Sequence, residues 1–112
     1  MANVYDYAHK LAKAIMDSEE YKHYKEMRET LYSDEKNKKM VEDFENKIFE
    51  LQMNQLSGKE VDEQELEKLG KMEDVLMLNP TIKSYFIAEQ RFGQLVQDIN
   101  NIIGEAISFD EE

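Results

Sequence analysis

The chain has 112 residues, of which 35% are charged and 41% hydrophobic, with a net charge of −11, one proline, four glycines and no cysteine or tryptophan. This composition favours a single helix-rich domain over a sheet protein or a disordered chain, and the length is short for a multidomain enzyme. The lack of cysteine excludes disulfides, thiolate metal sites, iron–sulfur clusters and cysteine nucleophiles, and the acidic surface disfavours general nucleic-acid binding.

The first two helices are expected at residues 4–17 and 19–32. Asn3 can cap the first helix, and Asp17-x-x-Glu20 resembles a capping box at the start of the second. The predicted apolar stripe of the first helix consists of Val4, Ala8, Leu11 and Ile15.

The third and fourth helices are expected at residues 34–57 and 62–78. Gly58 is a natural stop for the third, because glycine readily adopts the left-handed conformation that ends helices. Asp62 and Glu65 give a second capping-box match. The third helix has a wide predicted stripe, with Val41, Phe44, Ile48 and Leu51 in heptad steps and Met40, Phe49, Met53 and Leu56 beside them.

The fifth helix, expected at residues 80–107 and followed by an acidic tail at 108–112, is the longest. Asn79 can cap it, and Pro80 suits its first position, where a missing N–H costs nothing. The fifth helix spans about 42 Å and the third about 36 Å, whereas a compact chain of this size is about 34 Å across. We therefore predict an all-α, elongated bundle of about five helices, two of them long, assembled as a dimer.

The apolar side chains of the fifth helix cover a sector of about 200° when residues are placed at 100° intervals. One neighbouring helix cannot cover that sector, so the expected arrangement is a C2 dimer. The alternative is a monomer in which the third and fourth helices cover it. One edge of the sector is lined by Glu89, Gly93, Asn100 and Gly104. We hypothesise that Glu89 fixes the register in which the two helices pair. The predicted interface consists of Ile82, Tyr85, Glu89, Phe92, Gly93, Val96, Ile99, Asn100 and Ile103.

Candidate catalytic and metal-binding residues are sparse. The two histidines stand in Asp6-x-x-His9 and Glu20-x-x-His23, a spacing used by di-iron helical bundles. However, His9 projects away from its apolar stripe and His23 lies at the edge of its own. No serine lies in a G-x-S-x-G elbow, and the glycines are too scattered for a phosphate-binding or dinucleotide-binding loop. We predict no catalytic residue, no cofactor and no metal.

Five segments taken in order carry a family resemblance: 5–12 (YDYAHKLA), 17–21 (DSEEY), 44–52 (FENKIFELQ), 56–61 (LSGKEV) and, most densely, 79–92 (NPTIKSYFIAEQRF). They are similar to the YlbF/YmcA family of small helical proteins from Gram-positive bacteria, and within it to the uncharacterised YheA-like branch. The resemblance implies an all-α fold that forms dimers or larger assemblies, with no established catalytic residue. Better-studied branches imply a cytoplasmic adaptor in complexes linked to competence, sporulation, biofilm formation and RNase Y-dependent RNA processing.

Residues and resemblance together predict a non-enzymatic cytoplasmic homo-oligomer that acts as a protein-interaction adaptor. No apolar run reaches the ~18 residues of a membrane span, and the N-terminus lacks the layout of a signal peptide. Two alternatives stay open. A carrier would hold an apolar ligand between its helices, and an RNA-binding accessory factor in RNase Y-type processing would use Lys36, Lys38 and Lys39 together with Lys22 and Lys25.

Overall fold

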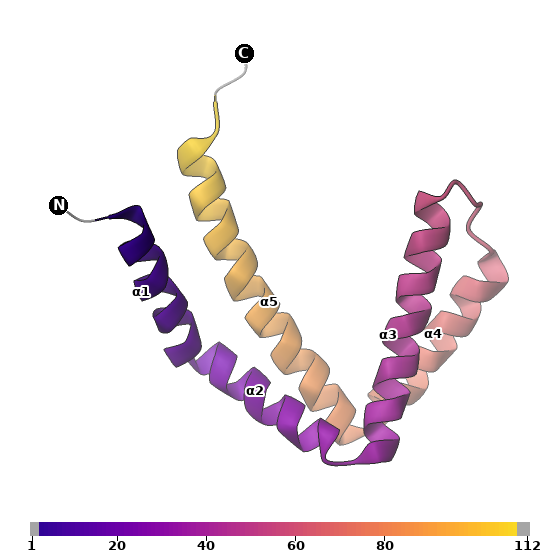
Figure 1. Ribbon diagram of the computed structural model, residues 1–112. Coiled ribbons are helices and arrows are strands. Elements are labelled where there is room, and N and C mark those ends of the chain that lie inside the picture. The colour runs from indigo at the N-terminus through magenta and orange to yellow at the C-terminus, as the bar shows by residue number, and fades with distance from the viewer. Residues whose placement is uncertain (1–2, 110–112) are drawn as a thin grey trace.

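The computed structural model describes residues 3–109, which form five helices and no strand (Figure 1). The helices are α1 (Val4–Asp17), α2 (Glu19–Tyr32), α3 (Glu35–Leu56), α4 (Glu63–Met77) and α5 (Pro80–Ile107). Each lies within one residue of the bounds expected from the sequence. The expected acidic tail falls mostly outside the described residues, which end at 109.

Local capping chemistry sets the ends of the longest helices. The side-chain oxygen of Asn79 accepts hydrogen bonds from the first backbone N–H groups of α5, as predicted. Gly58 has a φ of 89° and ends α3. The N–H of Lys59 there donates to the carbonyl oxygen of Asn54 over 3.0 Å, the long bond of a Schellman motif. These two signals confirm the predicted stop after α3 and the predicted start of α5.

A single residue, Ser18, separates α1 from α2. Its backbone is extended, so the helix cannot continue through it. Its hydroxyl donates a hydrogen bond to the carbonyl oxygen of Ile15 over 2.6 Å. The same hydroxyl oxygen accepts a hydrogen bond from the backbone N–H of Tyr21 over 3.2 Å. The capping box predicted to start at Asp17 is wrong, because Ser18 is the N-cap of α2 and serves both helix ends at once.

The five helices form a V with two arms (Figure 1). One arm contains α1, α2 and α5, and α2 packs along α5. The other arm is the antiparallel pair α3 and α4. The radius of gyration is 18.4 Å and the extents are 55 × 41 × 18 Å, whereas a compact chain of this length has a radius of gyration of about 13 Å. The molecule is therefore elongated, as the helix lengths predicted, and it is also flat.

The hydrophobic core lies where the two arms meet. It draws one residue from α2, two from α3, one from α4 and two from α5: Leu31, Val41, Phe44, Leu76, Ile82 and Tyr85. Aromatic side chains extend it along the α2–α5 seam, where the rings of Tyr24 and Phe92 stack with their centroids 5.3 Å apart. In contrast, no residue of α1 is buried. The core is small, and the outer parts of both arms leave apolar side chains uncovered.

Candidate interaction site

The nine residues predicted as an interface occupy three environments in α5. Ile82 and Tyr85 are 0% and 2% exposed and belong to the chain's own core. Glu89, Phe92, Val96 and Ile99 are half-buried, whereas Gly93, Asn100 and Ile103 are exposed. Because the chain itself buries Ile82 and Tyr85, only the predicted interface residues from Glu89 onward have surface to offer a second molecule.

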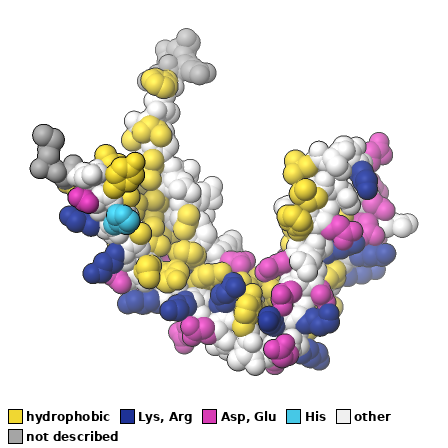
Figure 2. All heavy atoms as spheres, viewed as in Figure 1, with side chains coloured by type: hydrophobic (Ala, Val, Ile, Leu, Met, Phe, Trp, Pro, Cys, Tyr) yellow, Lys and Arg dark blue, Asp and Glu magenta, His cyan; other side chains and the backbone are white. Residues whose placement is uncertain are grey.

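An uncovered apolar surface lies at the open end of the first arm, and we call it the distal face. On α5 it contains Ile102, Ile103 and Ile107, which are 68%, 48% and 72% exposed. On α1 it contains Val4 and Leu11, which belong to the predicted stripe of that helix and are also exposed. Figure 2 shows apolar side chains gathered over this arm. Large exposed apolar surfaces mark interaction sites in proteins.

The stripe predicted for the third helix divides between two surfaces. Val41 and Phe44 are buried, as that stripe requires. Phe49, Met53 and Leu56, which widen the predicted stripe, are 63%, 48% and 81% exposed, so the chain itself does not cover this part of the stripe. At 100° per residue these three side chains lie on the side of α3 opposite the one that packs on α4. We call them the α3 stripe.

A cleft of about 580 Å³ lies at the base of the V, and we call it the inner cleft. It is lined by Tyr24 and Arg28 of α2, Phe44, Glu45 and Ile48 of α3, Glu73 and Met77 of α4, and Tyr85, Phe86, Glu89 and Gln90 of α5. The lining thus combines three carboxylates from three helices with aromatic side chains from α2, α3 and α5. Within residues 3–109 none of these carboxylates forms an ion pair.

Hydrogen bonding and burial shape the electrostatics of the inner cleft. The hydroxyl of Tyr85 donates to Glu89 Oε2 over 3.0 Å, so Glu89 is held by a neutral donor. Burial and the nearby Glu89 charge raise the pKa of the Glu45 carboxyl. Burial, followed by the Glu89 charge, also raises the pKa of the Tyr85 hydroxyl. The negative charge of the cleft is therefore poorly compensated.

Glu45→Gln should stabilise the protein at neutral pH and have little effect in acid. The folded state raises the pKa of Glu45, so it binds this proton more tightly than the unfolded chain does, and stability falls as pH rises through the folded pKa. Glutamine at this position does not ionise, so the variant does not lose this stability as pH rises. Urea unfolding between about pH 4 and 8 should show the advantage of Glu45→Gln growing with pH. The control is Glu29→Gln, at an exposed position on α2, and an equal pH trend in both variants would contradict the assignment.

Sequence reasoning found Glu89 but missed Arg28, Glu45 and Glu73. One signal was available: Glu45 stands one turn before Phe49 on the same side of α3, which places it in line with the α3 stripe. The approach of α2 and α4 to this point depends on how the two arms meet. Capping and periodicity do not encode that arrangement.

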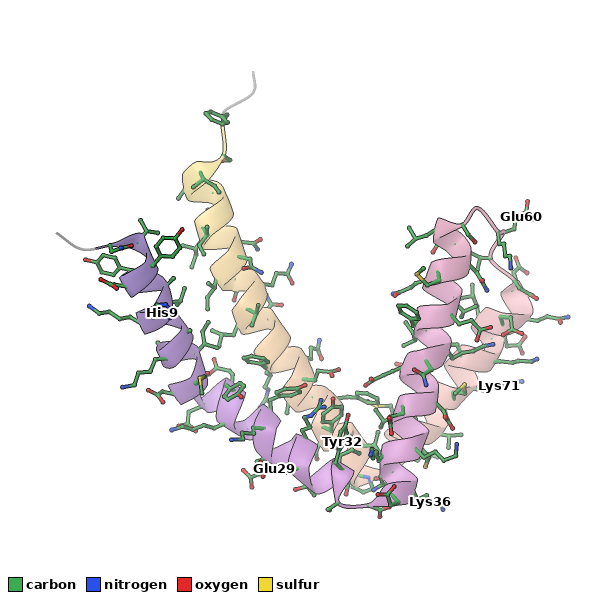
Figure 3. All side chains as sticks on the ribbon, viewed as in Figure 1. His9, Glu29, Tyr32, Lys36, Glu60 and Lys71 are labelled. Atoms are coloured by element: carbon green, nitrogen blue, oxygen red, sulfur yellow. The ribbon has the colours of Figure 1, made fainter. Side chains whose placement is uncertain are left out.

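The histidines and lysines do not assemble a second site. His9 and His23 are exposed, and among the described residues no three His, Asp or Glu side chains are grouped to hold a metal ion. Lys38 lies 5.6 Å from the ring centroid of Tyr32, and Lys39 pairs with Asp43 over 3.4 Å. Lys38 and Lys39, two of the three clustered lysines, thus interact with other side chains of the chain. Figure 3 labels Tyr32 and Lys36 near the base of the V.

An open cavity of about 650 Å³ lies between the free ends of α3 and α4. Its apolar lining includes Ile48, Leu51, Leu66 and Leu69, and an ion pair between Lys47 and Glu65 joins the two helices there. The lining also contains many amide and charged side chains. Polar residues therefore make up much of the lining, whereas sites for small apolar ligands place only a few polar groups among apolar ones.

Known proteins resemble this chain over nearly its whole length. A UPF0342 protein of Caldicellulosiruptor bescii is 39% identical over 112 residues, which cover 100% of this chain and 94% of that protein. A UPF0342 protein of Alkalihalophilus pseudofirmus is 41% identical over 107 residues, which cover 96% and 91%. Neither name describes an enzymatic activity. No helix within residues 3–109 is both long and hydrophobic enough to cross a membrane.

Two solved structures share the fold. A protein of unknown function (DUF964) from Bacillus stearothermophilus has a TM-score of 0.85 at 20% identity, with 93% of this chain and 91% of that chain covered. Bacillus subtilis RicA, solved in complex with RicF, has a TM-score of 0.63 at 23% identity, with 93% and 92% covered. The family described as control of competence regulator ComK, YlbF/YmcA, matches residues 4–108. The chain belongs to the YlbF/YmcA family.

Proposed function

We propose that this protein is a non-enzymatic cytoplasmic adaptor that assembles with itself through the distal face and binds other proteins in a regulatory complex. The main support is the amount of surface that the chain leaves exposed. The chain exposes 9227 Å², whereas a compact monomer of 13.3 kDa exposes about 6,450 Å². The excess of roughly 2,800 Å² is well above the ~800 Å² that each partner buries in a standard interface.

The chemistry of the distal face supports a second copy as its first occupant. Exposed isoleucines on α5 and apolar residues on α1 together give an apolar surface on two helices, and a second copy can cover it with the same surface. Two copies related by a two-fold axis would then form a four-helix contact from α1 and α5 of each. Of the interface predicted from the sequence, the proposed contact retains Ile103.

The adaptor role draws support from the family. The description of the family concerns control of a competence regulator, and RicA of similar fold was solved in complex with another protein, RicF. Both agree with a helical scaffold that offers uncovered apolar faces to other proteins.

Ile103→Asp should reduce the assembly to single chains. A carboxylate placed in an apolar interface loses its hydration without gaining a partner, so the dimer should dissociate. Multi-angle light scattering should give the unchanged protein at least twice the chain mass of 13.3 kDa and the variant one chain mass. The matched control is Val75→Asp, at an exposed position on the other arm, which should keep the assembly. A single-chain mass for the unchanged protein would refute the proposal.

A further inference from the structure

The space between the two arms is a groove whose walls begin at the inner cleft. On α3, Glu45 lines the cleft, and steps of four, four and three residues lead from it to Phe49, Met53 and Leu56, all on one side of the helix. On α5, Glu89 lines the cleft, and the side of the helix that bears it continues through Gly93, Asn100 and Gly104. Figure 1 shows the two arms diverging from this base.

The two walls differ in chemistry. The α3 wall is the α3 stripe, and it is the exposed apolar surface of the second arm that faces the groove. Figure 2 shows apolar side chains on this side of the α3–α4 arm. The α5 wall is polar and small. A Cβ added at Gly93 or Gly104 would meet nothing within 4 Å, so another backbone has room to approach α5 closely.

The floor of the groove has a net negative charge. Glu45, Glu73 and Glu89 contribute three carboxylates, and Arg28 is the one cation among the residues that line the cleft. The Arg28 guanidinium lies 4.5 Å from the ring centroid of Tyr32. A cationic side chain entering the cleft would meet carboxylates from three helices together with aromatic rings, a setting that favours lysine or arginine.

We propose that this groove binds a cationic amphipathic helix of a different protein. The apolar side of that helix lies on the α3 stripe, its backbone approaches the glycines of α5, and a lysine or arginine enters the inner cleft. Charge favours a different protein over a second copy, because a second copy has a net charge of −11 and would bring repulsion on average. The inference rests on the proposed adaptor function and names the chemistry of its partner.

Photocross-linking in the cells that produce the protein tests this assignment. The photoreactive residue p-benzoylphenylalanine replaces Phe49 in the full chain, and a control chain has it in place of Val75 on the other side of the same arm. Mass spectrometry should find that position 49 cross-links to a peptide of another protein, with apolar residues at helical spacing and at least one lysine or arginine. Cross-links to this chain's own peptides, to lipid or to RNA, or no cross-link specific to position 49, would overturn the proposal.

The charge of the floor is tested in the same cross-linking chain. Substitution of Glu45, Glu73 and Glu89 by glutamine should lower the yield at position 49 by about tenfold or more, because loss of close charge pairs weakens binding by at least that factor. Glu73→Gln alone should also lower the cross-linking yield at position 49. Because Glu73 is exposed, this single variant guards against a folding defect in the triple variant. An unchanged yield would overturn the proposal. Light scattering on the same chains measures self-assembly separately. Absence of self-assembly would contradict the proposed function, whereas absence of the cross-link alone, in the chain that retains the three glutamates, would contradict the groove assignment.

Discussion

Leu31→Ala should lower the free energy of unfolding by about 2–5 kcal/mol, because deleting a fully buried leucine side chain removes its transfer free energy and leaves a cavity. Leu31 is 0% exposed and lies where α2, α3, α4 and α5 meet. Few other buried residues can compensate, since the six-residue core joins both arms. Urea unfolding followed by circular dichroism gives the change directly.

Leu78→Ala is the matched control for this prediction. Leu78 is also a leucine, but it is 83% exposed at the end of α4. An exposed substitution away from special features changes stability by about 0.5 kcal/mol or less. If the two variants lost similar stability, the core would not lie at the junction of the arms.

Features that depend on a few neighbouring residues could be predicted from the sequence. Asn79 caps α5 and Gly58 ends α3 because each signal acts within one turn of the chain. The joint at Ser18 shows the limit of this reasoning. Asp17 and Ser18 both suit an N-cap, and only the extended backbone of Ser18 decides between them.

Features that depend on the meeting of the arms could not be predicted in this way. The periodicity of α3 indicates a wide apolar stripe, but the sequence does not say that Phe44 joins a core whereas Phe49 remains exposed. The candidate interface shows the same limit. Helical spacing groups Ile82 with Ile103, although the core covers the first and leaves the second exposed. The convergence of Glu45, Glu73 and Glu89 likewise arises from three helices and has no signature in any one of them.

A thousandfold dilution should lower the apparent free energy of unfolding by about 4 kcal/mol if folding and self-assembly are coupled. Each tenfold dilution of a two-state dimer costs about 1.4 kcal/mol, because unfolding releases two chains from one assembly. The exposed area makes such coupling the expected behaviour. With 9227 Å² exposed, the chain alone buries only about half of its unfolded surface, less than the ~60% typical of a marginal 60-residue domain.

Thermal or urea unfolding at several protein concentrations measures this dependence. Ile103→Asp provides the internal comparison, because a chain that no longer assembles should unfold at the same midpoint at every concentration, and at a lower one than the unchanged protein. If the unchanged protein also unfolded at a concentration-independent midpoint, the small core at the junction of the arms would hold the fold by itself. The apolar surface of the distal face would then serve partners rather than folding.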